Sequence, residues 1–363
     1  MKVILTKRTK LFITNTTIYT CIFLLLINSK TVLNSINISL DLFIHNLIPS
    51  LFIYILITEI LINSNLMYTL SLGLSNILSK IFRIPKNTTF ILIISYLLGY
   101  PNAAKCIYKL YSDNKINLKL AKKLLAFTNN ASPAYILCSI GIGMFNNVDV
   151  GILLLISHFF SSIIIGLCYP TSNDIIQQNI TNSNTFTKIS SSSQILTTSL
   201  LNSFKTLGII LGYTIIFSLI PSLILTKQNI PELINGLFIS VFEITNGIKT
   251  LSTLAVNTTT LLCVISFILS FSSLMIIFQI HSFVYKIGIK LKELLLYKLI
   301  HGTLSSIITY LLLKLNIIKL NLVLDVSLNL SLIKELNIPL NFMYIFIIFL
   351  TILLLYITLK KKR

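Results

Sequence analysis

Residues 150–169 read VGILLLISHFFSSIIIGLCY, a run that contains no Asp, Glu, Lys or Arg. About 20 mostly apolar residues are what an α-helix needs to cross the hydrocarbon core of a bilayer. Other apolar runs of comparable length occur at residues 11–28, 42–62, 197–225, 257–280, 294–315 and 341–359. The sequence therefore predicts an all-α membrane protein that crosses the bilayer many times.

The bulk composition excludes an ordinary water-soluble protein. Of the 363 residues, 55% are hydrophobic and only 11% are charged, and the mean hydropathy is +0.88. Soluble domains carry about 25% charged residues. The bilayer therefore replaces a single water-excluding core as the environment that organises this chain.

Positive charge is concentrated at both ends of the chain, whose formal net charge is +19. Basic residues precede the first apolar run within residues 1–10 and follow the last run at residues 360–363. Lysine and arginine that flank membrane helices in this way indicate the cytoplasmic side. We expect both termini in the cytoplasm and an even number of crossings, about eight. Nucleic-acid binding by the basic tails is a weaker interpretation, because a basic run alone is weak evidence.

A polar stretch divides the chain into two halves. Residues 171–193 are rich in Ser, Thr and Asn, a composition typical of an exposed loop. We predict an N-terminal membrane helix with a short loop, a first half, a polar loop, a second half, and C-terminal membrane helices with a basic tail, at residues 1–41, 42–169, 170–195, 196–290 and 291–363.

Each half also contains apolar elements that are interrupted or too short to cross. Residues 89–100 and 133–145 lie on either side of a predicted lysine-rich helix within residues 105–123, and both fit re-entrant or half helices. Each half opens with a long apolar helix interrupted by polar residues, around Asn46 in the first half and Asn202 in the second. Paired broken segments point to a transporter's substrate site. A two-fold, inverted internal repeat is one interpretation of this pairing.

Two breaks in the first half could form a substrate site. Pro101, after Gly99, should end one helix and begin another. Further along, Ser132 suits a helix N-cap and Pro133 the first helical position. Such a half helix directs free N–H groups towards an anion. An ordinary loop and cap at the membrane surface is the alternative, but the side chains beside the breaks favour a site: Asn102, Lys105, Asn129 and Asn130.

The second half carries one conspicuous carboxylate, Glu243, after an apolar helix for which Gly247 is a plausible C′ residue. A carboxylate near the middle of a membrane helix costs roughly 2.5–3.5 kcal/mol. We expect it to be protonated, paired with Lys205 or Lys249, or bound to a cation. The alternative is a solvated Glu243 on an interfacial helix.

Polar side chains follow in the same half. Thr245 and Asn246 are predicted to face the substrate with Glu243. The serines of residues 270–273 are at least as well explained by helix packing. Gln279 is the better substrate contact.

The sequence has no recognisable catalytic or metal-binding set. The four histidines are scattered without ligand spacing, and the five cysteines form neither a disulfide framework nor a zinc site. No nucleophile elbow, HExxH motif or phosphate-binding glycine loop occurs. We therefore predict a protein that is not an enzyme and holds no cofactor or metal.

The succession of these motifs resembles the YlbJ family of sporulation integral membrane proteins, within the broader nucleoside-recognition or Gate-domain membrane proteins. The resemblance covers roughly residues 40–285. It rests on Gly99-Tyr100-Pro101 with Ala104-Lys105, Phe127-Thr128-Asn129-Asn130 with Pro133, Gly141 and Gly143-Met144-Phe145, then residues 242–247 and 270–279. The chain departs from the expected pattern where Ser272-Ser273 replace a glycine pair and Ala103 replaces a glycine, so close backbone approach is harder there.

The resemblance implies a spore-forming bacterium and movement of dipicolinate from mother cell to forespore, with this protein in the outer forespore membrane. Gate domains are otherwise associated with nucleoside transporters. We expect a transporter of a small anionic metabolite in which Lys105 pairs with a carboxylate and Glu243 carries a proton or cation. The predicted substrate contacts are Asn102, Lys105, Asn129, Asn130, Ser132, Glu243, Thr245, Asn246 and Gln279.

Three alternatives remain open. A cation-coupled nucleoside carrier would use the amides and the carboxylate to bind base and ribose. A non-transporting scaffold of the spore envelope would have no pore, and a membrane enzyme is the weakest interpretation. Homo-oligomers are common among transporters, but no motif here specifies one.

Overall fold

The computed structural model describes residues 15–16, 19, 22–64, 66–170, 192–225, 231–254 and 256–317. These residues fall within one compact unit, Met1–Leu320. The regular elements in these ranges are all helices, as the apolar runs predict. The predicted crossing at residues 341–359, most of residues 11–28 and the polar loop at residues 171–191 lie outside the described residues.

Within the described ranges, five helical stretches are long and apolar enough to cross a membrane. They are Ser29–Leu61, Val148–Cys168, Ser192–Leu225, Thr258–Ile287 and Leu291–Lys314. A bent pair, Gly73–Phe82 and Lys86–Leu98, turns through 104° and makes a sixth crossing if it is one broken span. Five of the seven predicted full crossings correspond to these stretches, which confirms a multi-pass helical membrane protein.

The first half contains one long helix, a further 17-residue helix followed by a short turn, two broken pairs and one full-length helix. Its elements are α2 (Ser29–Leu42), η1 (Phe43–Leu47), α3 (Ile48–Asn63), α4 (Leu66–Phe82), η2 (Lys86–Thr88), α5 (Phe90–Leu98), α6 (Asn102–Ser112), α7 (Leu118–Phe127), η3 (Tyr135–Ile142) and α8 (Val148–Cys168). The long helix is α2, η1 and α3 together. The broken pairs are α5 with α6 and α7 with η3.

The second half repeats this order without a counterpart of α4. Its elements are α10 (Ser192–Leu225), α11 (Glu232–Phe242), α12 (Ile244–Ser252), α13 (Thr258–Phe271), α14 (Ser273–Val284), η4 (Tyr285–Ile287) and α15 (Leu291–Lys314). The long helix is α10, the broken pairs are α11 with α12 and α13 with α14, and α15 is the full-length helix. Each half therefore supplies two helix breaks.

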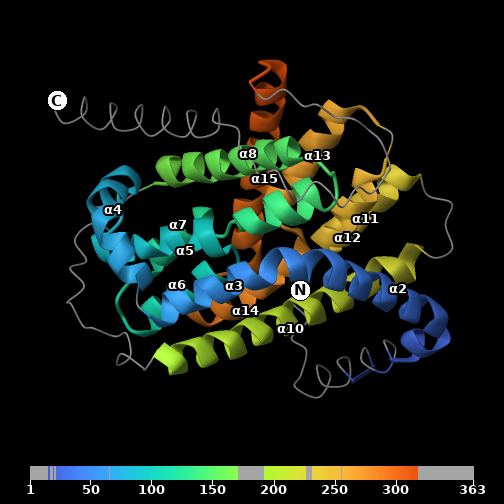
Figure 1. The fold of residues 1–363 in the computed structure, drawn as a ribbon, viewed down its shortest axis with the longest axis horizontal. Coiled ribbons are helices and arrows are strands. Elements are labelled where there is room, and N and C mark those ends of the chain that lie inside the picture. The colour runs from blue at the N-terminus through green and yellow to red at the C-terminus, as the bar shows by residue number, and fades with distance from the viewer. Residues whose placement is uncertain are drawn as a thin grey trace, which may run out of the picture. The chain divides into compact units, whose positions relative to one another are not determined.

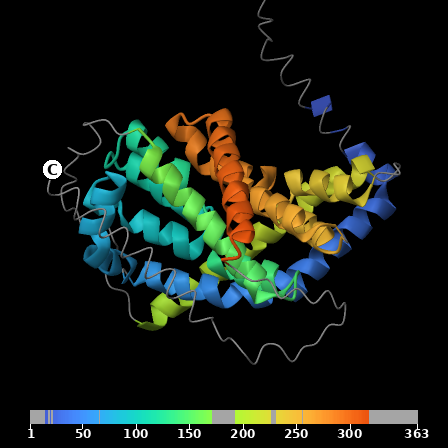
Figure 2. The ribbon, with the colours of Figure 1, turned by 90° about the horizontal axis from the view of Figure 1, so that it is seen from above.

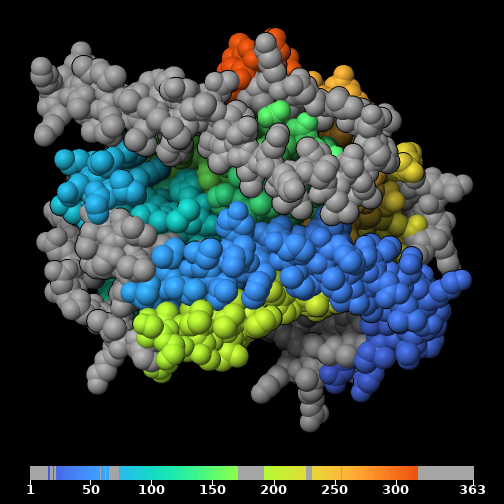
Figure 3. Space-filling view, in the orientation of Figure 1, coloured from blue at the N-terminus to red at the C-terminus, as the bar shows by residue number. Residues whose placement is uncertain are grey.

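The long helices of the two halves lie side by side. Helix α10 packs along α2 and α3, and Figure 1 shows α3 and α10 running across the same side of the molecule. Figure 3 shows both on one face. Large apolar side chains there are exposed, including Ile53 and Ile57 of α3 and Leu201, Phe204 and Ile216 of α10. Contiguous exposed apolar surface of this kind is what a membrane-embedded helix presents to lipid.

Helices α8, α13 and α15 pack against one another (Figure 2). Small polar residues allow this close approach, since Ser266 and Ser305 share a 2.8 Å hydrogen bond between their hydroxyl groups. Thr309 donates to Ser266 at 2.7 Å. Membrane helices lack a hydrophobic driving force between them, so small residues and interhelical hydrogen bonds hold such contacts.

Two predictions about individual elements are wrong. The lysine-rich helix is two helices, α6 and α7, because Asn114 adopts a positive φ of 55° and Asn117 begins a new helix by accepting a 2.8 Å bond from the Leu120 N–H. The polar residues near Asn202 do not interrupt α10, which continues through them. The Asn202 side chain instead donates to Glu59 of α3 at 3.1 Å.

Candidate functional site

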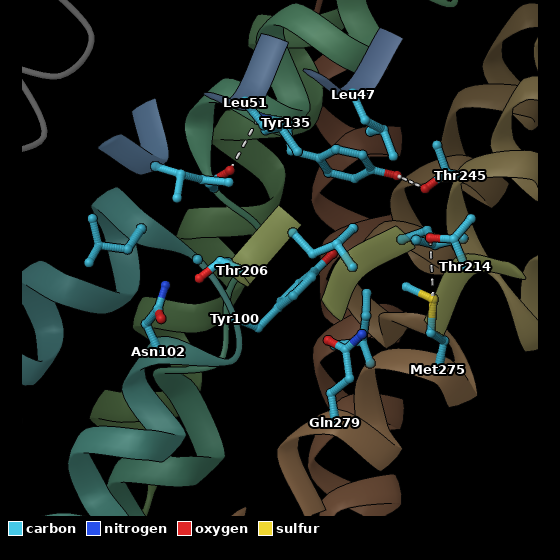
Figure 4. Close-up of a pocket in the computed structure, with 17 residues that line it drawn as sticks. Leu47, Leu51, Tyr100, Asn102, Tyr135, Thr206, Thr214, Thr245, Met275 and Gln279 are labelled. Carbon is cyan, nitrogen blue, oxygen red and sulfur yellow. Dashed lines mark hydrogen bonds between the residues drawn. The ribbon is translucent and has the colours of Figure 1, made fainter. Parts of the chain in front are cut away.

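A cavity of about 90 Å³ lies where elements of both halves meet. Figure 4 shows the rings of Tyr100 and Tyr135 in the middle of its wall, with Asn102 on one side and Thr214 and Met275 on the other. The polar lining residues are Tyr100, Asn102, Ser132, Tyr135, Thr206, Thr214, Thr245 and Gln279. Leucine and isoleucine side chains make up most of the rest. An apolar cavity with a few convergent polar groups is the usual form of a ligand site.

Four of the nine predicted substrate contacts line this cavity: Asn102, Ser132, Thr245 and Gln279. The structure brings them together from α6, the segment before η3, α12 and α14. The other five predicted contacts do not line the cavity, and each makes other contacts that are described below. They are Lys105, Asn129, Asn130, Glu243 and Asn246.

The first break joins α5 to α6 and also contacts the second break. Gly99 has φ 71° and ψ −173°, which only glycine adopts readily. The Tyr100 N–H then donates to the carbonyl oxygen of Asn130 at 2.8 Å. A Cβ atom on Gly99 would lie 2.7 Å from the backbone nitrogen of Ser132. The chain therefore requires glycine here to hold the two breaks against each other.

The second break lies between α7 and η3. Its asparagine amides bond to the preceding helices, and a serine caps the helix that follows. The amide nitrogen of Asn129 donates to the Leu125 carbonyl at 2.9 Å, and that of Asn130 donates to the Ser95 hydroxyl at 2.9 Å. The Ser132 hydroxyl accepts from the N–H of Tyr135 at 3.2 Å. The predicted cap is therefore in place, but both asparagine amide nitrogens hold the fold rather than face the cavity.

Glu243 occupies the break between α11 and α12 rather than the interior of a helix. It is fully buried, and its two carboxylate oxygens accept from the backbone N–H groups of Thr245 at 2.8 Å and Asn246 at 2.6 Å. Hydrogen bonds and the positive end of the α12 dipole offset the cost of burying this charge. Among the described residues no lysine pairs with it, so the predicted partners Lys205 and Lys249 are wrong.

Gly247 lies inside α12 and is not the C′ residue of the preceding helix. A Cβ atom there would clash with Cα of Ser240 and lie 2.6 Å from the backbone nitrogen of that residue. Glycine is thus required by the close crossing of α11 and α12. The predicted break at Gly247 is actually at Glu243.

Lys105 and Asn246 also contact neighbouring helices and do not line the cavity. The Lys105 ammonium lies 5.5 Å from the centre of the Phe283 ring. The Asn246 amide nitrogen donates to the Ser218 hydroxyl of α10 at 2.9 Å. The first contact joins α6 to α14 and the second joins α12 to α10.

Tyrosines in the cavity wall were not predicted as contacts. The Tyr135 hydroxyl lies 3.3 Å from that of Thr245, which connects the two halves across the cavity. Tyr100 follows Gly99 in the first break, and its position beside a glycine and a proline is a signal that the sequence already carried. Tyr135 carries no comparable local signal.

Three buried basic residues contact the second break or one another. We call Lys298 and His301 of α15 with His158 of α8 the basic cluster. The Ala131 N–H donates to Nε2 of His158 at 2.9 Å. Since that nitrogen accepts, the imidazole proton sits on Nδ1, which lies 2.7 Å from the Ser270 hydroxyl. His158 thus connects the second break of the first half to the end of α13.

The remaining members of the basic cluster contact backbone carbonyls. The ring nitrogen Nε2 of His301 lies 2.9 Å from the carbonyl oxygen of His158. The Lys298 ammonium donates to the carbonyl oxygen of Asn129 and lies 5.8 Å from the centre of the Tyr100 ring. A lysine inside the predicted crossing at residues 294–315 was the signal that could have identified this cluster.

Several buried polar atoms near the breaks have no hydrogen-bond partner among the described residues. They are the hydroxyl groups of Tyr100 and Ser273, Oδ1 of Asn129 and Asn130, and Nε2 of Gln279. Buried polar groups are nearly always paired, so such atoms call for a partner that the described residues do not supply. Tyr100 and Gln279 belong to the cavity wall, and a polar ligand there could pair with them. No group of three or more metal-binding side chains occurs in the described part of the chain.

Comparison with known proteins gives one informative match. The chain is 26% identical over 300 residues to the sporulation integral membrane protein YlbJ of Bacillus subtilis (strain 168), an alignment that covers 73% of this chain and 74% of that protein. No protein-family model and no solved structure matches the chain.

Proposed function

From the resemblance to the YlbJ family, which the comparison confirms, we propose that this chain is a sporulation membrane protein that carries a small organic anion across the bilayer. Dipicolinate moving from mother cell to forespore is the leading substrate. The outer forespore membrane, with both termini in the cytoplasm, is the corresponding location. The single observation that carries the proposal is the cavity lined by the long helices and the broken elements of both halves.

The charges around the cavity favour an anion. None of the described lining residues is Asp or Glu, and the nearby Glu243 carboxylate is engaged by the first turn of α12. The Lys298 ammonium lies against the Tyr100 ring of the wall. A half helix also begins at the Ser132 side of the cavity, and its N-terminus favours negative charge.

The size of the cavity implies that the wall moves during transport. A cavity of about 150 Å³ is known to admit benzene, whereas this one measures about 90 Å³. A pyridine ring with two carboxylates is larger than benzene, so Met275 and Gln279 must move or helices must separate before it enters. We therefore interpret this arrangement as a closed conformation of a carrier.

The test is counterflow of radiolabelled dipicolinate in proteoliposomes that contain the purified protein. Thr206→Trp would fill the cavity from α10 and should reduce flux at least about tenfold, which corresponds to ~1.4 kcal/mol. Leu201→Trp is the matched control, because Leu201 lies on the same helix and its side chain is exposed to lipid. Absence of flux from folded protein, or equal flux in the two variants, would contradict the proposal.

A nucleoside carrier is the second candidate, favoured by the hydroxyl groups of Thr206, Thr214 and Thr245 and the amide of Gln279 in the wall. These groups can hydrogen-bond a ribose and a base. Uptake of labelled uridine that is not inhibited by dipicolinate would support this candidate. A spore-envelope scaffold would instead leave sporulation insensitive to Thr206→Trp.

A further inference from the structure

We propose that Lys298 is the coupling residue of this carrier, a tethered cation that takes the place of a bound sodium ion and makes transport proton-driven. The proposal rests on the transport function proposed above and adds the identity of the coupling ion. It assigns a role to a residue that lies outside the cavity wall.

The position of the Lys298 ammonium is that of a coupling cation in carriers with broken helices. Helix α7 ends at Phe127, and the ammonium donates to the carbonyl oxygen of Asn129, immediately beyond that end. Unwound carbonyls and the negative ends of half helices are what hold sodium or protons in such carriers. Here a covalently attached ammonium already makes that contact, so a sodium ion at the same carbonyl would meet direct charge repulsion.

The surroundings of Lys298 allow it to lose its proton. The side chain is 6% exposed within α15, a helix apolar enough to span the membrane. No described carboxylate contacts it, since Glu243 caps α12 and Glu293 pairs with Lys122 of α7 at 2.9 Å. A positive charge without a carboxylate partner is costly at such a depth. Lysine can relieve this cost by deprotonation, whereas arginine cannot.

The other titratable groups that face Lys298 are less suited to carrying the proton. Tyr100 faces it from the first break, while His301 and His158 lie with it in the basic cluster. Nε2 of His158 already accepts from the Ala131 N–H, so protonation there would break a buried contact of the second break. His301 is directed at the His158 carbonyl oxygen. His158 therefore holds the second break and His301 contacts His158, so Lys298 is the group that can release and take up a proton.

The charge on Lys298 can influence the cavity, because the ammonium contacts residues of the breaks that form its wall. The charged ammonium contacts both Asn129 in the second break and the ring of Tyr100 in the cavity wall. Loss of the proton to water on one side of the membrane weakens the cation–π contact and the charge-assisted bond together. Uptake of a proton from water on the other side restores them. One proton thus crosses in each cycle, and the break positions respond to it.

The experiment uses proteoliposomes with radiolabelled dipicolinate in three arms: a pH gradient, a sodium gradient, and counterflow with neither gradient. Pyranine inside the vesicles reports proton movement. We expect wild-type protein to accumulate substrate with the pH gradient, to move protons with it, and to ignore sodium. Lys298→Met should lose at least about 90% of the pH-driven accumulation, equivalent to ~1.4 kcal/mol, while counterflow stays measurable because exchange needs no net coupling.

Two further variants keep the test decisive. Lys298→Arg keeps the charge but cannot release it, so pH-driven accumulation should also be lost. Lys292→Met removes an exposed lysine from the same helix and should behave as wild type. If Lys298→Met does not fold, the proposal is still tested by Lys298→Arg and by the response of wild-type protein to the pH and sodium gradients.

The outcomes separate the two proposals. Sodium-driven uptake, or pH-driven accumulation that persists in Lys298→Met or Lys298→Arg, would overturn the role of Lys298 and leave the carrier intact. Absence of wild-type counterflow would instead remove the proposed function, and the coupling role with it.

Discussion

The backbone of Tyr100 is hydrogen-bonded to that of Asn130, with the Tyr100 N–H donating to the Asn130 carbonyl oxygen at 2.8 Å. This bond joins two helix breaks that are separated by α6 and α7. It places Tyr100 in the cavity wall on one side and Ser132, two residues after Asn130, on the other. The two breaks therefore act as one structural unit, and changes at either should affect both.

Gly99→Ala should destabilise the protein strongly. The residue has φ 71° and ψ −173°, and an added Cβ atom would lie 2.7 Å from the Ser132 nitrogen. Backbone strain and overpacking together should cost more than about 3 kcal/mol. Thermal unfolding in detergent measures the change. Gly208→Ala on α10, where a Cβ meets nothing within 4 Å, is the control and should be neutral or stabilising.

His158→Phe should lower the free energy of unfolding by about 2–3 kcal/mol, because it leaves the buried Ala131 N–H and Ser270 hydroxyl without their partner. Chemical denaturation of the purified protein would measure the loss. His45→Phe is the matched control, since the His45 side chain is 71% exposed and its replacement should change stability by less than about 0.5 kcal/mol. An equal effect of the two substitutions would show that His158 does not hold the break.

Glu243→Ala should cost about 2 kcal/mol of stability, and Glu243→Gln about half as much, because glutamine keeps one of the two oxygens that cap α12. A capping role also predicts that Glu243→Gln retains dipicolinate counterflow. Glu232→Gln, at an exposed position of α11, is the control. Complete loss of counterflow in a stable Glu243→Gln protein would instead assign Glu243 to ion or substrate binding.

Stability should rise between about pH 8 and pH 10 because of Lys123, a buried residue of α7 outside the membrane-spanning helices. Burial, with the nearby Arg83 charge, lowers the pKa of Lys123 to about 8. Above that pH the folded protein has lost a proton that the unfolded chain keeps until about pH 10.4. Unfolding free energy therefore increases with pH, by at most about 1.4 kcal/mol per unit.

Thermal unfolding of Lys123→Met across the same pH range isolates this effect. The difference in stability between wild type and variant should change with pH in that window. Lys119→Met, at an exposed position of the same helix, should follow the wild-type curve. Parallel curves for wild type and Lys123→Met would contradict the lowered pKa.

Local chemistry explains which features of the fold could be predicted. Apolar runs predict membrane helices because the cost of placing a segment in lipid depends on its own composition. Pro101 and Pro133 predict helix boundaries because proline lacks an N–H donor and has a fixed φ. The same logic failed at Gly247, where glycine permits a close crossing of α11 and α12 instead of ending a helix.

The site was only partly predictable because its geometry depends on distant partners. Asn102, Ser132, Thr245 and Gln279 were selected for their polarity beside breaks, and they do line one cavity. Asn129 and Asn130 satisfied the same criterion, yet their amide nitrogens bind within the first half.

By itself the sequence determined that this protein is a many-helix membrane protein with broken elements in each half, because hydropathy and proline chemistry act over a few residues. The tertiary structure alone decided that Glu243 caps a helix, that Lys298 reaches the carbonyl of Asn129, and that His158 joins Ala131 to Ser270. The Lys298 and His158 contacts join residues on different helices. Packing of distant segments therefore selects those partners. Glu243 bonds to its own neighbours Thr245 and Asn246, but the helix break that makes these bonds possible could not be located from the adjacent residues.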